Sequence, residues 1–205
     1  METIIDNAYE FLWDRLKYQT EAGLTGGQHR AYSGKTTELF VDNIITLFKS
    51  RYPTLDIEVR DDRDKIKVMG KDGKTYTQES VDRHVYINGK LELIIECKTY
   101  LDKCYLQRAT DDARLVRKGV PHPIQAWVIS LENGLSDMAY NFFMYQDDEI
   151  YVNECFFLTN GKRSSAAPLY KNNNYQSRLN KEKIQKLIES FDYFFQTYQQ
   201  NQKVE

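Results

Sequence analysis

The dipeptide Asn88-Gly89 lies between two apolar runs, 81–87 and 91–98, and is the strongest hairpin signal in this chain. A two-residue turn at this dipeptide would place Asp82 and Glu96 on opposite faces of the hairpin. A three-residue loop, with the glycine in a left-handed bulge, shifts the pairing by one residue and places the two carboxylates side by side. The choice of register therefore decides whether the hairpin carries a cluster of acidic groups.

The apolar pattern favours the bulged register, because a slip of one residue would scramble a buried face. In that register Ile87 pairs with Leu91, Val85 with Leu93, and Asp82 with Glu96. Its core face, with Arg83 as the only charged exception, consists of Val81, Val85, Ile87, Leu91, Leu93, Ile95 and Cys97. We therefore predict that Asp82 and Glu96 are neighbours.

Lys98 is expected beside these carboxylates, because residues two apart on a strand point to the same side. Adjacent carboxylates repel each other, and a divalent cation such as Mg²⁺ relieves the repulsion. A nearby lysine can then orient or deprotonate a water molecule aimed at phosphorus, while the metal stabilises the charge on the phosphate. The alternative is a surface network of ion pairs at a strand end.

Apolar periodicity and turn residues predict a single α/β domain over 1–205, with a mixed sheet flanked by helices. The expected N-caps are Ser33, Asp102 and Asn180. The expected elements are an N-terminal amphipathic helix, a helix over about 36–50, strands over 55–60, 65–69 and from Tyr76, the hairpin strands, a helix over about 103–118, a strand over 124–131, a short helix from Ser136, a strand over 150–158, and a closing helix. The strand–helix–strand crossover implies that 124–131 pairs in parallel with 91–98.

Composition narrows the function classes. The net charge of −2 argues against coating of nucleic acid by bulk electrostatics, and no apolar run is long enough to span a membrane. The three cysteines suit a reducing cytosol, and the acidic N-terminus has no secretion signal, so we expect a cytoplasmic protein. Two stretches are locally basic: 160–183 has six basic residues and one acid, and 26–35 has no acid. Such loops could position phosphates, or they could be ordinary solvated loops.

The order of helix, strands, hairpin, E-x-K, helix and strand resembles the PD-(D/E)xK nuclease superfamily, especially the small type II restriction endonucleases. The motif in this chain is Val81-Asp82, thirteen further residues, and then Glu96-Cys97-Lys98, with Val81 in place of the family's proline. The resemblance covers the core, about 36–131. The remainder, 132–205, adds a strand, a basic loop and the closing helix.

The resemblance implies a restriction-endonuclease-like α-β-β-β-α-β core and an Mg²⁺-dependent endonuclease. Asp82, Glu96 and the Cys97 backbone carbonyl would bind the metal, and Lys98 would activate the attacking water. Glu38 stands where many members place a further glutamate. Hydrolysis would cut sequence-specific sites in double-stranded DNA and leave 5′-phosphates.

Symmetric cleavage by such an enzyme implies a homodimer, and the family implies a cognate DNA methyltransferase that protects the host. The loop over 171–176 is rich in Asn and Gln, which can bind adenine in the major groove, although the same residues also suit a plain polar turn. The candidate DNA contacts are Arg30, Lys35, Arg163, Lys171, Asn173, Asn174, Gln176 and Arg178.

Several alternatives stay open on the sequence alone. Another nuclease of the same fold, such as a junction resolvase or a repair nuclease, would carry the same motif. A catalytically silent DNA-binding module would keep the fold without activity. Ser33-Gly34-Lys35-Thr36 resembles the end of a phosphate-binding P-loop but lacks its first glycine. Cys97 and Cys104 could form a redox pair, although Cys97 is expected in the core.

Overall fold

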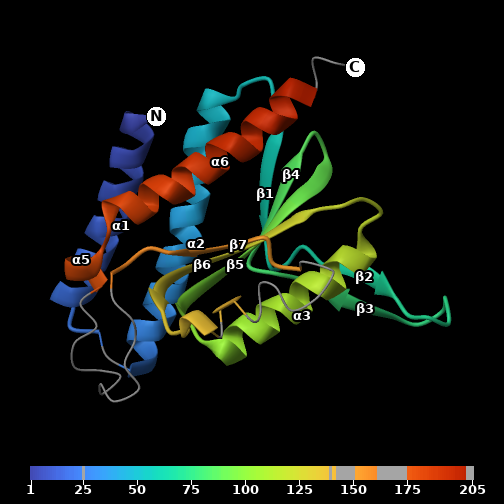
Figure 1. The fold of residues 1–205 in the computed structure, drawn as a ribbon, viewed down its shortest axis with the longest axis horizontal. Coiled ribbons are helices and arrows are strands. Elements are labelled where there is room, and N and C mark those ends of the chain that lie inside the picture. Colours follow the sequence, from blue (N-terminus) through green and yellow to red (C-terminus); the bar gives the residue numbers. More distant parts are fainter. Residues whose placement is uncertain (25, 139, 142–150, 161–174, 202–205) are drawn as a thin grey trace.

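A five-stranded mixed sheet is the centre of the computed structural model, which describes residues 1–24, 26–138, 140–141, 151–160 and 175–201 (Figure 1). The strand order is β1-β4-β5-β6-β7. The first three strands are antiparallel, and β5, β6 and β7 are parallel. The strands are β1 (Ile57–Asp61), β4 (Arg83–Ile87), β5 (Lys90–Leu101), β6 (Gln125–Asn133) and β7 (Glu154–Phe157). The predicted parallel pairing of β5 with β6 is confirmed.

Helices cover both faces of this sheet. One face packs against α1 (Glu2–Glu21), α2 (Gly26–Arg51) and α6 (Lys181–Asn201), in a core that includes Phe40, Leu93 and Trp127. The other face packs against α3 (Lys103–Gly119) through Val116 and Ile94. Because both faces are covered, β4 is buried along its whole length. In the described part of the chain no helix is long and apolar enough to cross a membrane.

Near Asp82 and Glu96, β4 and β5 pair in the predicted register, but the bulged residue does not lie in the turn. Val85 pairs with Leu93 and Arg83 with Ile95, as expected. The prediction that Ile87 pairs with Leu91 is wrong, because Ile87 pairs with Lys90 across a two-residue turn. Asn88 and Gly89 both have positive φ in this turn, at 52° and 77°. The shift occurs at Glu92, between the Tyr86–Leu91 and Val85–Leu93 pairs.

This bulge also corrects the predicted faces of the hairpin. Leu91 packs with Tyr86 on the α3 side of the sheet rather than with Val85 on the α2 side. A bulge inside the strand changes the alternation only for the residues between it and the turn. Val81, also predicted beside Val85, packs with Tyr86 and Ile94 on the α3 side too, just before β4 begins. Beyond the bulge β5 keeps the predicted alternation, with Ile95 and Cys97 in the core on the α2 side.

The start of α2 differs from the prediction. The helix begins at Gly26 rather than near residue 36, and Ser33 lies inside it, fully buried, instead of capping it. The Ser33 hydroxyl donates to the His29 carbonyl oxygen and accepts a hydrogen bond from Gln19 Nε2. The glycines suggested a loop, but packing against α1 buries this turn and holds it helical. Because Ser33-Gly34-Lys35-Thr36 is helical, it forms no P-loop.

The other two predicted caps are confirmed. The Asp102 side chain accepts a hydrogen bond from Tyr105 N at the start of α3, and Asn180 Oδ1 accepts one from Lys183 N at the start of α6. Tyr140 N donates to Ser136 O, in line with a helical turn after Ser136. A short α5 (Tyr175–Arg178) precedes α6.

A second sheet consists of two strands only, β2 (Ile66–Met69) and β3 (Tyr76–Glu79). This hairpin joins β1 to β4 and extends past the end of α3, away from the main sheet (Figure 1). It approaches α3 very closely at Gly119, where an added Cβ would lie 2.7 Å from both Ile66 Cγ2 and Lys67 O.

Replacement of Asn88 by alanine should lower the free energy of unfolding by about 1–2 kcal/mol, because alanine adopts positive φ poorly and makes no side-chain hydrogen bond. Asn88 Oδ1 accepts from Asp56 N at 3.0 Å. Urea unfolding measures the change, with exposed Lys90→Ala as the control, which should change stability by less than about 0.5 kcal/mol. An Asn88→Ala protein as stable as wild type would contradict this account of the turn.

Candidate active site

The candidate site lies where β4 stops pairing with β5. The ladder between the two strands ends at the Arg83–Ile95 pair, so the following residues of β5 have a strand neighbour only in β6. Cys97 N faces this open edge and donates to Asp82 Oδ2 at 2.7 Å. A buried backbone N–H needs an acceptor, and the Asp82 carboxylate supplies it in place of a strand. This bond fixes the Asp82 side chain beside Glu96.

Lys98 joins the two carboxylates. Its Nζ lies 3.4 Å from Asp82 Oδ2 and forms a short ion pair with Glu96 Oε2. The side chains of Lys98 and Glu96 are only 20% and 9% exposed, so this is a largely desolvated cluster and not a network on the surface. The structure therefore brings Asp82, Glu96 and Lys98 together, as the sequence predicts.

The cluster holds two carboxyl groups against the single amino group of Lys98. Burial raises the pKa of Glu96, and the neighbouring Asp82 carboxylate raises it further. Burial alone would lower the pKa of Lys98, but the Glu96 and Asp82 carboxylates outweigh it and the pKa is raised. Two carboxylates that share one cation are held together at a cost, which a second positive charge would relieve.

The Cys97 side chain lies on the face of β5 opposite to its neighbours Glu96 and Lys98. Its side chain is buried in the core on the α2 side, as predicted, and burial raises the pKa of its thiol. Cys104 is exposed near the start of α3, and both thiols are free. A raised pKa disfavours the thiolate, so Cys97 suits packing and not redox chemistry.

Glu38 lies beside the cluster on α2, where Lys35 and Arg83 hold it. Glu38 Oε2 is 2.8 Å from Lys35 Nζ and 3.2 Å from Arg83 Nη2. Arg83 also forms a bidentate ion pair with Asp42 and donates from Nη1 to the Asp82 carbonyl oxygen at 2.6 Å. Through Arg83, α2 is tied to the backbone of the residue that presents the first carboxylate.

Nothing in the sequence pattern pointed to Asp42, and Arg83 had no predicted role. A signal was present, since Arg83 was the only charge on an otherwise apolar face, and a buried arginine requires an acidic partner. The partner could not be chosen from the sequence, because Asp42 lies 41 residues away on a helix whose rotation was unknown.

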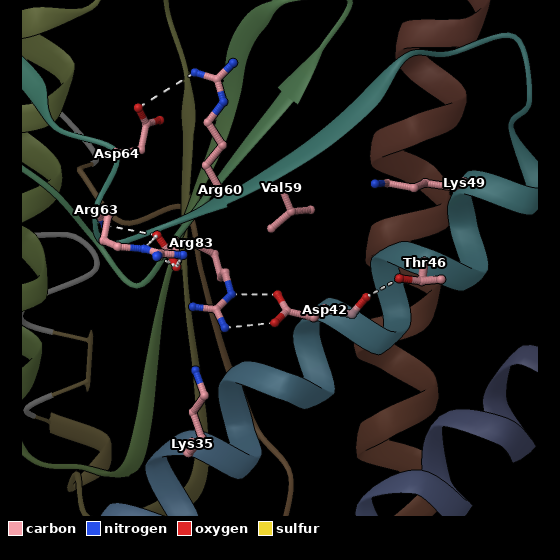
Figure 2. Close-up of a pocket in the computed structure, with 10 residues that line it drawn as sticks. Lys35, Asp42, Thr46, Lys49, Val59, Arg60, Arg63, Asp64 and Arg83 are labelled. Carbon is pink, nitrogen blue, oxygen red and sulfur yellow. Dashed lines mark hydrogen bonds and ion pairs between the residues drawn. The ribbon is translucent and has the colours of Figure 1, made fainter.

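A cleft of about 700 Å³ adjoins this ion pair, between α2, β1 and the start of β4 (Figure 2). Arg83 reaches across it to Asp42, and Arg60 extends toward Asp64 on the other side (Figure 2). Its cationic lining residues are Lys35, Lys49, Arg60, Arg63 and Arg83, against Asp42, Asp61 and Asp64. Arg83 therefore links this cleft, in which basic side chains outnumber acidic ones, to the backbone of Asp82.

The predicted DNA contacts fall into three groups. Arg30 and Lys35 are exposed on α2, and Lys35 lines the cleft. Arg178 forms an ion pair with the buried Glu132 at 2.6 Å, which gives it a structural partner, and Gln176 lies half-buried in α5. The remaining candidates, Arg163, Lys171, Asn173 and Asn174, lie outside the described residues.

The donor set suits a hard divalent cation. Asp82 and Glu96 provide carboxylate oxygens, and the predicted Cys97 carbonyl would add a third oxygen, while Lys98 holds the positive charge between them. Among the residues described, no three His, Cys, Asp or Glu side chains cluster as a metal centre. The site thus offers two carboxylates and leaves the other positions to backbone and water, as Mg²⁺ sites often do.

Comparison with family models finds no match, and neither does comparison with curated proteins. Among solved structures, the chain is similar to NucC of P. aeruginosa in its cAAA-bound form. The similarity covers 94% of this chain and 91% of NucC, with a TM-score of 0.51 and 16% identical residues. This chain has a restriction-endonuclease-like fold. The predicted fold class is therefore confirmed.

In the restriction-endonuclease-like fold of this chain, the carboxylate cluster should make stability depend on pH. The pKa of Glu96 is higher in the folded protein than in the unfolded chain. Its contribution to stability is therefore fully present below the unfolded pKa and is lost as pH rises through the folded pKa. In EDTA, raising the pH from 5 to 9 should therefore destabilise wild type relative to Glu96→Gln by at least about 1.4 kcal/mol, the value of one pKa unit.

Urea unfolding at the two pH values measures this difference. Glu10→Gln, at an exposed position of α1, is the matched control and should track wild type at both pH values. Equal pH dependence of wild type and Glu96→Gln would contradict the proposed electrostatics.

Proposed function

We propose that this protein is an Mg²⁺-dependent DNA nuclease of the PD-(D/E)xK type. The observation that carries the proposal is the buried contact of Lys98 with both Asp82 and Glu96, at the edge of β5 that β4 leaves open. The restriction-endonuclease-like fold supports it, because this is the fold that the superfamily resemblance implies.

The residues would divide the reaction as follows. Asp82, Glu96 and the Cys97 carbonyl would hold Mg²⁺, which supplies charge stabilisation at the scissile phosphate and a more acidic bound water. Lys98 would orient the attacking water and, as its neutral amine, take the proton that this water loses, while a solvent water would protonate the leaving 3′ oxygen. Glu38, kept in place by Arg83 and Lys35, would orient further water at the rim of the site. Hydrolysis would leave a 5′-phosphate.

The cleft beside Arg83 would accept the sugar–phosphate backbone next to the scissile bond. Arg83 lines the cleft and donates to the Asp82 carbonyl oxygen, so a strand in the site would pass the cations of the cleft. Arg30 would extend the same track toward the start of α2. Backbone contacts of this kind fix the position of DNA but do not read its sequence.

Sequence-specific cleavage, as in type II restriction enzymes, is the narrower proposal. The structural similarity to NucC supports the fold, so a DNA nuclease outside the restriction enzymes fits equally well or better. A homodimer and a partner methyltransferase belong to the narrower proposal only. A catalytically silent DNA-binding protein is the alternative from another class.

The first test is cleavage of large unmethylated phage DNA with and without Mg²⁺. Lys98→Ala should lower the cleavage rate at least about 100-fold, because a positioned acid–base group typically contributes that much. Asp82→Asn and Glu96→Gln should do the same, whereas Lys90→Ala should cleave at the wild-type rate. All variants are first checked for folding by circular dichroism. Lys98→Ala that cleaves like wild type would refute the assigned site.

The products separate the narrower proposals. Discrete fragments would indicate a sequence-specific endonuclease, and a smear would indicate a nuclease without a defined site. Because the similar NucC structure is cAAA-bound, each reaction is also run with cAAA, so that a ligand-dependent enzyme is not mistaken for a silent module. Absence of cleavage on duplex, branched and single-stranded DNA under all conditions would contradict nuclease activity.

A further inference from the structure

The β2–β3 hairpin carries an unusual surface. In its register Met69 pairs with Tyr76 and Lys67 with Gln78, so these four side chains share one face. All four are exposed, and Met69 and Tyr76 are 48% and 54% exposed, which places them among the few large apolar side chains of the described chain that face solvent. An apolar pair on a projecting hairpin contributes nothing to the core.

The opposite face of the hairpin accounts for its attachment. Ile66 and the buried Val68 point toward α3, where Gly119 allows the hairpin backbone to approach closely. An alanine at Gly119 would place its Cβ 2.7 Å from Lys67 O, so the contact depends on the absence of a side chain there. The hairpin is therefore docked at a fixed angle, with its outer face free.

The charges on the hairpin are positive and available. Residues 65–79 contain four lysines and two acids. Asp72 is engaged within the turn, where its carboxylate accepts from Lys74 N, Thr75 N and Thr75 Oγ1. Within the described ranges, Lys71 and Lys74 form no ion pair, and Lys67 lies over the ring of Tyr76, with its Nζ 4.4 Å from the ring centroid. The outer face and tip thus combine lysines with one aromatic ring.

The hairpin base lies at the candidate active site. Lys65 Nζ donates to Ser80 Oγ at 2.7 Å, two residues before Asp82. Asp112 on α3 interacts electrostatically with Lys98 of the candidate site and with Glu79 of β3, so it lies near both the site and the hairpin. Burial raises the pKa of Asp112. Tyr76 is six residues before Asp82, so the extended chain keeps them within about 20 Å, the rise of about six base pairs.

We propose that the β2–β3 hairpin is a DNA-binding arm that enters the major groove of the substrate duplex beside the scissile phosphate. This inference rests on the proposed nuclease function. Lys67, Lys71 and Lys74 contact phosphates, and Tyr76 and Met69 pack against the bases. The width of the major groove accommodates a two-stranded β-ribbon, and Gln78 on the same face can pair with adenine.

The experiment measures binding of a fluorescent 24-base-pair duplex by anisotropy in EDTA, over a series of salt concentrations. The test variant is Lys67→Gln/Lys71→Gln/Lys74→Gln. The control has the same net charge and changes three exposed lysines elsewhere, Lys17→Gln/Lys90→Gln/Lys186→Gln. Each lost phosphate contact lowers the slope of log affinity against log salt by about 0.9, so the test variant should lose about 2–3 slope units. Its affinity at 0.15 M salt should fall about tenfold or more, and the control should bind like wild type.

A second variant separates the apolar contacts from the charges. Met69→Ala/Tyr76→Ala should keep the wild-type salt slope and bind about fivefold or more weakly, because stacking on a base contributes about 1–3 kcal/mol. An unchanged affinity would overturn the insertion of this face into the groove. Both hairpin variants change exposed residues, and circular dichroism verifies that they fold.

The outcomes distinguish this inference from the proposed function. If wild type binds and cleaves DNA and the triple hairpin variant matches the control, the arm is refuted and the nuclease stands. If wild type neither binds nor cleaves DNA, both fail. If the hairpin variants change the oligomeric state in sedimentation velocity without changing DNA affinity, the hairpin contacts a second copy of the chain and the DNA-binding arm is refuted.

Discussion

The hydrogen bond from Cys97 N to the Asp82 carboxylate organises this structure. It satisfies the first backbone donor that β4 leaves unpaired, and it places the Asp82 side chain next to Glu96 at the edge of the sheet. A longer β4 would pair this donor with a carbonyl oxygen and release Asp82 to solvent. The candidate site therefore follows from where one strand stops, and the Lys98 ammonium group balances the charges that collect there.

Two features flank the candidate site, a group of ion pairs on the α2 side and the β2–β3 hairpin on the α3 side. On the α2 side, Arg83 ties Asp42 and Glu38 to the backbone of Asp82. On the α3 side, the chain leaves the sheet as the β2–β3 hairpin and returns just before Asp82. A nucleic acid in the site would thus contact a cationic cleft on one side and a projecting arm on the other.

The sequence predicted the parts of this arrangement that depend on local pattern. The period-two alternation of the hairpin strands placed Asp82 opposite Glu96, and capping residues located the starts of α3 and α6. It failed where long-range packing outweighs local preference. Burial against Gln19 keeps the Gly- and Ser-containing start of α2 helical around Ser33, and the bulge moved from the turn to Glu92. The Arg83–Asp42 ion pair could not be predicted from the sequence, because it depends on how α2 is rotated about its axis against the sheet.

The most direct measurement is diffraction from crystals soaked in Mn²⁺, recorded at a wavelength where manganese scatters anomalously. We expect an anomalous peak about 2.0–2.3 Å from one oxygen each of Asp82 and Glu96, with Lys98 moved away from the bridging position. The same peak should be absent from Asp82→Asn crystals. A folded wild-type protein with no peak at these carboxylates, or with manganese bound elsewhere only, would contradict the proposed metal site.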